Sequence, residues 1–135
     1  MNLQILLDKF NIKADISILL EMWNESHRSF HNLDHLNDII SQINESYGNK
    51  QINELQKEKL LLTALFHDII YDPSKQDNEE KSADFLMSLC QEKNDKDIID
   101  IKNAILDTKT HKSSTPLSLI FNRFDMSIVE RNYDD

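Results

Sequence analysis

The 135-residue chain is long enough to bury one hydrophobic core but short for two, so we expect a single domain over residues 1–135. Hydrophobic residues make up 39% and charged residues 29% of the sequence, which fits a globular protein and excludes general disorder. The formal net charge of −9 disfavours nucleic acid as a partner, whereas a small phosphorylated metabolite remains compatible. The chain has only one glycine and two prolines, so material for tight hairpins is scarce and helices are favoured.

Features of membrane and secreted proteins are missing from the sequence. The longest apolar run, around Leu60–Phe66, is far too short to span a bilayer, which predicts no membrane partner. The N-terminus has no basic stretch followed by a long apolar one, as a secretory signal would. The single cysteine, Cys90, cannot form an internal disulfide. Together these features indicate a cytoplasmic protein.

Apolar residues recur at helical spacing from the start of the chain. The pattern predicts a first helix over residues 2–10 and a second over residues 15–29. Asp15 precedes the apolar positions of the second helix and is placed to cap its N-terminus. A third helix is expected over residues 31–47, and the Gly48–Asn49 pair ends it by turn chemistry.

The middle of the chain carries its most apolar segment. A fourth helix is predicted over residues 54–71, and it is apolar nearly all round between Leu60 and Ile70. A helix of this kind is buried at the centre of its domain. A fifth helix begins at Asp77, which together with Glu80 has the spacing of a capping box.

The last third of the chain is also expected to be helical. A sixth helix over residues 95–107 is followed by a loop over 108–116 and a shorter seventh helix over 117–129. No segment has the sustained alternation of a β-strand. The sequence therefore predicts an all-α fold, a compact helical bundle.

A histidine and an aspartate stand together near the end of the most apolar helix. An ionised carboxylate at Asp68 is unfavourable there unless something compensates it. A divalent cation is the simplest compensation, because it uses both the imidazole of His67 and the carboxylate. The alternative is a capping or salt-bridged pair near a helix end, and an isolated His-Asp dipeptide favours this alternative.

A second group of polar residues lies at the start of the third helix. His31 and His35 are four residues apart and share one helix face. Arg28 and Asn32 crowd the same segment with groups suited to metal, phosphate and proton transfer. A zinc peptidase would need a glutamate directly after the first histidine, where this chain has Asn32. The alternative for this group alone is a solvated helix start.

These groups belong to a series of sequence blocks. In this order and at these distances, the blocks resemble predicted metal-dependent phosphohydrolases of the HD superfamily, over about residues 20–130. The resemblance implies an all-α, HD-domain-like fold. The blocks are Arg28–His35, Ala64–Pro73, Asp77–Ala83, Ile105–His111 and Phe124–Val129.

The resemblance implies a metal site. Members of this superfamily hold a divalent ion through a histidine, a later His-Asp doublet and a distant aspartate, which here are His35, His67, Asp68 and Asp125. One or two ions are expected, and Mn, Mg, Fe, Co, Ni and Zn are not distinguished. Asp68 is also given a catalytic role, since its two oxygens can bridge to a second ion. A similar His-Asn-x-x-His segment in cyclic-nucleotide phosphodiesterases makes His31 the general acid.

Other positions are assigned to the substrate and to water. Glu79 is expected to orient the attacking water or hold an ion through water, with a solvated helix-start carboxylate as the alternative. Arg28, Lys109 and His111 are assigned to substrate binding. For Arg28 the alternative is a surface ion pair with a neighbouring glutamate. For His111 the alternatives are a place in a second metal site and an exposed loop position.

The predicted function is metal-dependent hydrolysis of a phosphate ester or anhydride by a metal-activated water. A small nucleotide or phosphorylated metabolite is the expected substrate, and a homodimer is compatible with the sequence. The alternative is a catalytically inactive HD protein that binds a metal or nucleotide and acts in regulation. Relatives carry an aspartate at the position of Arg123. They also continue with further helices after the last one here, so the resemblance implies a short member that lacks these helices, either a natural short form or a fragment.

Overall fold

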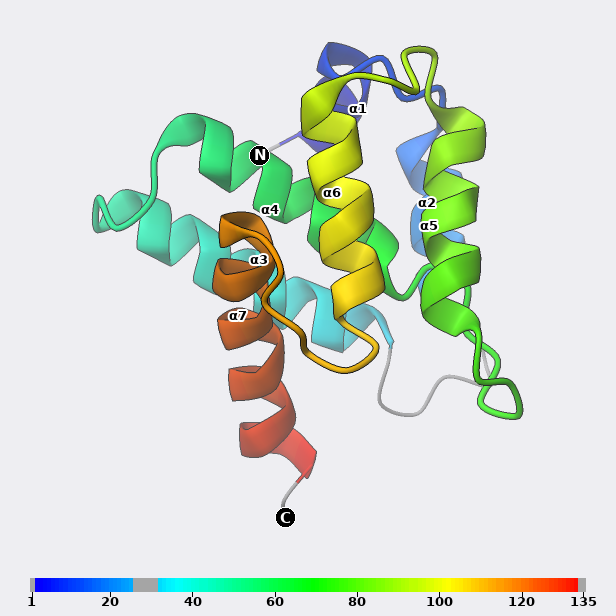
Figure 1. The fold of residues 1–135 in the computed structure, drawn as a ribbon. Helices are drawn as coiled ribbons and strands as arrows, with labels where there is room; N and C mark the ends of the chain where they lie inside the picture. The colour runs from blue at the N-terminus through cyan, green and yellow to red at the C-terminus, as the bar shows by residue number, and fades with distance from the viewer. Residues whose placement is uncertain (1, 26–31, 134–135) are drawn as a thin grey trace.

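The computed structural model describes residues 2–25 and 32–133, with side chains described as far as residue 126. Within these residues the chain is helical and has no β-strand, apart from an isolated bridge between Ile12 and Cys90. The all-α prediction is therefore confirmed (Figure 1). The helices are α1 (Leu3–Lys9), α2 (Ile16–Trp23), α3 (Leu33–Gly48), α4 (Glu54–His67), α5 (Asn78–Leu89), α6 (Lys96–Asp107) and α7 (Pro116–Tyr133).

Side-chain caps explain where several helices begin. Asp15 accepts a hydrogen bond from the backbone N–H of Ser17 at the start of α2, as predicted. At the start of α4, the Asn53 side chain accepts from the Gln56 N–H, and the Gln56 side chain accepts from the Asn53 N–H. This reciprocal pair satisfies two backbone donors that the first turn of a helix leaves without partners.

The capping box predicted for α5 is wrong. Asp77 stands at the N-cap but its side chain accepts no capping hydrogen bond, and its backbone (φ −116°, ψ 23°) is not extended. Its carboxylate instead lies 3.8 Å from Nζ of Lys81. The carboxylate of Glu80 accepts a hydrogen bond from Nζ of Lys109 at 2.8 Å. A long-range ion pair has thus replaced the local cap.

Helices α1 and α3 each end in a turn with one residue in the left-handed backbone conformation, and in neither turn is that residue a glycine. After α3, the left-handed residue is Lys50 (φ 62°) rather than Gly48 or Asn49. The N–H of Gln51 donates to the Ser46 carbonyl, and that of Lys50 donates to Tyr47, the hydrogen bonds of a Schellman motif. Asn11 (φ 58°) has the same position after α1. The predicted stop of α3 is therefore confirmed, but its chemistry is carried by a lysine.

Helix α4 stops four residues before its predicted end. The indole Nε1–H of Trp23 donates to the Leu65 carbonyl at 2.8 Å. If the helix continued, the backbone N–H of Ile69 would donate to this carbonyl. It donates to the Phe66 carbonyl instead. Asp68 becomes the C-cap, so the His67–Asp68 pair stands where the chain turns out of the helix.

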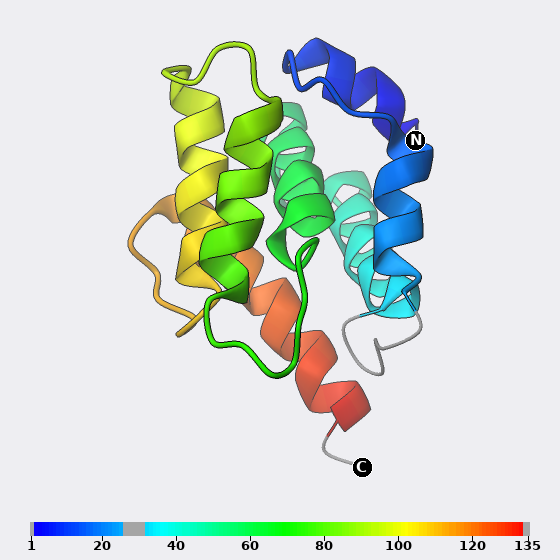
Figure 2. The same ribbon diagram turned by 90° about the vertical axis from the view of Figure 1, so that its right-hand side faces the viewer.

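The central position predicted for the fourth helix is confirmed. Every residue from Leu60 to Ile69 is buried, and α4 packs against α1, α3, α5, α6 and α7. Figure 2 shows α5 and α6 side by side on one flank of α4 and α3 on the other. The backbone of α7 crosses one end of this group, and its C-terminal part extends beyond the other helices. Within the described ranges, no helix has the combined length and apolar character that crossing a membrane requires.

Candidate metal centre

The last residue of α4 presents one imidazole nitrogen to a buried cluster. Nδ1 of His67 lies 2.7 Å from the Ala64 carbonyl. A carbonyl only accepts, so this nitrogen carries the proton and donates it. In the neutral ring, Nε2 is then left with a lone pair. Nε2 is buried and has no hydrogen-bond partner among the described residues, although Asp68 Oδ2 lies 3.3 Å away.

Helices α3 and α7 bring two further side chains to this nitrogen. His35 is buried in the first turn of α3, where the Asn32 side chain accepts a hydrogen bond from its backbone N–H. Oδ1 of Asp125 lies 3.3 Å from Nε2 of His35 and 3.6 Å from Nε2 of His67. The carboxylate of one helix thus stands between the imidazoles of two others.

The ligand atoms of His35, His67 and Asp68 all lie within 4.8 Å of one another, and all three residues are buried. Asp125, also buried, joins them through its contacts with both imidazoles. Imidazole and carboxylate ligands suit a divalent ion of hard or borderline character. The orphaned Nε2 of His67 is the atom that such an ion would satisfy. The residues present therefore fit a divalent metal.

Without a cation, the cluster shifts the proton affinities of its members. Burial lowers the pKa of His67, but the carboxylates of Asp68 and Asp125 outweigh it and raise this pKa to about 9. Burial likewise raises the pKa of Asp125, yet the imidazoles of His111, His35 and His67 hold it well below its usual range. In the absence of a cation, a proton on His67 thus offsets part of the negative charge of Asp68 and Asp125.

Aromatic rings enclose the imidazole of His67. The Trp23 ring lies 5.6 Å from it, centroid to centroid, and the Phe121 ring lies 5.1 Å away in an edge-on arrangement. The sequence predicts no role for Phe121 at this site. Phe121 precedes Asp125 by four residues on the predicted last helix, so its helical spacing could have placed it on the same face.

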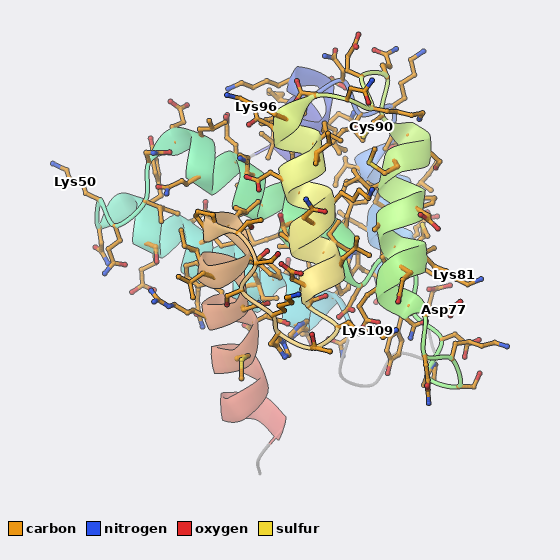
Figure 3. The ribbon with its side chains drawn as sticks, viewed as in Figure 1. Lys50, Asp77, Lys81, Cys90, Lys96 and Lys109 are labelled. Atoms are coloured by element: carbon orange, nitrogen blue, oxygen red, sulfur yellow. The ribbon has the colours of Figure 1, made fainter. Side chains whose placement is uncertain are left out.

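The structure places the other predicted site residues in different surroundings. His111 is partly exposed, and its Nε2 lies 3.1 Å from Oδ2 of Asp125. Lys109 is exposed at the end of α6 beside the start of α5, where Asp77 and Lys81 lie (Figure 3). Glu79 is partly buried in the first turn of α5, and its charge helps to raise the pKa of Lys109, mainly raised by Glu80. Two predicted residues, Arg28 and His31, lie outside the described residues.

Comparison with models of protein families identifies the family of this chain. The model of the HD domain family matches residues 35–126, well over half of the chain. The matched segment begins at His35 and ends one residue after Asp125, so it contains the whole cluster. No curated protein and no solved structure matches the chain.

Proposed function

The chain belongs to the HD domain family, and from that premise we propose that it is a metal-dependent phosphohydrolase. The observation that carries the proposal is the buried cluster of His35, His67 and Asp68. In this proposal, Asp125 completes the set of side chains that hold one divalent ion. Asp68 would also contribute to holding a second ion, where one binds.

The reaction we propose is hydrolysis of a phosphate ester or anhydride. When bound, the ion acidifies a coordinated water towards neutral pH and stabilises the charge on the phosphoryl group. The protein contributes an apolar wall, because the rings of Trp23 and Phe121 lie against the His67 ring and limit the access of water to it. Low local polarity strengthens every charge interaction made there.

Proton transfer and substrate binding are assigned from the resemblance. His31 is proposed as the acid that protonates the leaving oxygen, and Glu79 as the residue that orients water. Arg28 and Lys109 are proposed to bind phosphate. The exposed ion pair between Lys109 and Glu80 supports this role for Lys109, because such pairs are weak and a phosphate group can compete for the ammonium.

A small nucleotide or another phosphorylated metabolite is the proposed substrate. The net charge of −9 favours a small anion neutralised at the site over a long polyanion that meets the whole surface. Nucleic acid is therefore not proposed as a substrate. A cytoplasmic location and a homodimer remain predictions from the sequence.

The proposal is tested with purified protein that has been stripped of metal and reloaded with Mn²⁺. We expect it to release phosphate from at least one member of a panel of nucleotides and sugar phosphates. Asp68→Asn, which removes a charge at nearly constant shape, should lose both metal and activity. Asp84→Asn, at an exposed position on α5, is the matched control and should keep both.

The proton donor is tested separately. His31→Ala should keep the metal and lose roughly 100- to 10,000-fold in turnover, whereas His35→Ala should lose the metal as well. Loss of metal in His31→Ala and its retention in His35→Ala would exchange the two roles. Metal binding without phosphate release from any member of the panel would favour the inactive, regulatory alternative. Equal metal content in the wild type and Asp68→Asn would contradict the site.

A further inference from the structure

We propose that His111 is a positioning residue, which holds the Asp125 carboxylate so that one of its oxygens faces the two buried imidazoles. The loop between α6 and α7 is built to fix His111 in that place. This inference rests on the proposed function, because the oriented carboxylate is one of the groups assigned to the metal. It replaces substrate binding as the role of His111.

The two oxygens of Asp125 have different neighbours. Oδ1 lies 3.3 Å from Nε2 of His35, whereas Oδ2 lies 3.1 Å from Nε2 of His111. The terminal torsion of an aspartate has a broad, shallow energy profile, so the carboxylate does not hold its own orientation. A donor on Oδ2 selects the orientation in which Oδ1 is directed at the cluster. Hydrogen bonds of this kind orient metal-ligating carboxylates in general.

The backbone at His111 is held in an uncommon conformation. Its φ is 52°, in the left-handed region, which histidine enters more readily than most side chains but still at a cost. The N–H of Lys112 donates to the Asp107 carbonyl at 3.0 Å, and this hydrogen bond closes the turn around His111. The turn thereby fixes the backbone from which the ring reaches Asp125.

The same loop is tied to α7, the helix that carries Asp125. The Asn122 side chain donates from Nδ2 to the Lys112 carbonyl at 3.0 Å. At the other end of the loop, the Asp107 carboxylate accepts from the Ser118 hydroxyl at 2.6 Å. Ser118, Asn122 and Asp125 are all buried and share one face of α7. One helix face therefore positions both members of the His111–Asp125 pair.

The hydrogen bond between His111 and Asp125 also restricts the other roles that His111 can have. The carboxylate only accepts, so Nε2 of His111 carries a proton and donates it to Asp125. A nitrogen that donates a proton has no lone pair for a metal ion. Through this nitrogen, His111 acts on the proposed ion only by way of Asp125.

The test uses Co²⁺ alone as the probe, with affinity from competition dialysis and ligand geometry from the visible absorption bands. His111→Gly removes the ring and tolerates the left-handed backbone without strain. We expect it to weaken Co²⁺ binding by roughly 10- to 100-fold and to change the absorption spectrum. His111→Gln offers an amide donor near the position of Nε2 and should restore much of both. Thr110→Gly, at an exposed neighbouring position, adds loop flexibility without removing the ring and should match the wild type.

The outcomes separate the two proposals. A wild type that binds no Co²⁺ would overturn the proposed function and this inference together. A wild type that binds Co²⁺, with His111→Gly equal to it in affinity and spectrum, would overturn only the role of His111. The role of His111 would also be overturned if Thr110→Gly weakened Co²⁺ binding as much as His111→Gly does. It would likewise be overturned if His111→Gln restored neither the affinity nor the spectrum, since the hydrogen bond would not then be the cause.

Discussion

The hydrogen bond from His67 to the Ala64 carbonyl decides which nitrogen of the ring is available to the cluster. A metal ion needs the lone pair on Nε2, but the neighbouring carboxylates raise the pKa of the ring to about 9 when no cation is present. Near neutral pH, the metal-free protein therefore carries a proton where the ion would bind. Binding of the ion should release this proton.

The proton on His67 predicts how the stability of the metal-free protein depends on pH. A pKa raised from 6.5 to about 9 stabilises the folded state below pH 6.5, and this contribution is lost as the pH rises to 9. His111, whose pKa Asp125 also raises, acts in the same direction. We expect the free energy of unfolding in chelator to fall by roughly 3 kcal/mol over this range, measured by urea denaturation.

Exposed ion pairs should not obscure this fall in the free energy of unfolding, because their groups do not titrate between pH 6.5 and 9. The pKa of Lys109 is raised from 10.5 and that of Glu80 is lowered from 4.5, so both titrate outside the range from pH 6.5 to 9. The stability of protein loaded with Mn²⁺ should instead rise with pH, because fewer protons then compete with the ion for the side chains of the cluster. Stability in chelator that rises with pH across this range would contradict the protonated cluster.

The sequence predicted part of the candidate site, for a clear physical reason. His67 and Asp68 are adjacent near the end of the most apolar segment of the sequence, so their burial follows from the pattern alone. The contact between His111 and Asp125 could not be foreseen, because it depends on a left-handed residue in a segment that contains no glycine. Side-chain contacts across such a loop depend on tertiary structure.

The start of a helix depends on the polar side chain at its N-cap, and the N-caps of α4 and α5 can be compared directly. Asn53 forms a complete capping box at the start of α4, whereas Asp77 at the start of α5 forms no capping hydrogen bond. Asn53→Ala should lower the free energy of unfolding by about 1 kcal/mol. Asp77→Ala should change it by less than about 0.5 kcal/mol. Urea denaturation of both variants at the same pH measures the difference.

Equal costs for the two substitutions would mean that Asp77 caps α5 in solution. A smaller cost for Asn53→Ala than for Asp77→Ala would contradict the capping assignments of both helices. The weak ion pair between Asp77 and Lys81 is exposed, so it should add little to either value.

Periodicity predicted that the helices exist, but not where each one ends. The apolar pattern of α4 continues through Ile70, so nothing local stops the helix at His67. The hydrogen bond from Trp23 to the Leu65 carbonyl, which comes from another helix, accounts for the stop. The capping box at Asp77 was wrong for a similar reason, since Glu80 pairs with Lys109 across 29 positions of sequence. Contacts distant in sequence therefore decided what the local pattern could not.

At the scale of the molecule, the candidate metal centre lies where α3, α4 and α7 meet. Side chains from all three helices contribute to it, so an ion bound there favours the folded over the unfolded chain. At a free Mn²⁺ concentration 100 times the dissociation constant, this linkage adds about 2.7 kcal/mol. We expect chelation to lower the melting temperature by roughly 10 °C.

Asp68→Asn provides the control for this effect. Its melting temperature should be the same with and without chelator, because it lacks the charge that the ion requires. A wild type that melts at the same temperature in Mn²⁺ and in chelator would contradict the coupling between the metal centre and the fold.

Anomalous scattering from a crystal soaked in Mn²⁺ tests the metal assignment most directly. Data collected on both sides of the manganese absorption edge should show a peak among His35, His67, Asp68 and Asp125. Its distance to the imidazole and carboxylate atoms of these residues should be roughly 2.0 to 2.4 Å. A peak only elsewhere in the molecule, or no peak at all, would contradict the proposed metal centre.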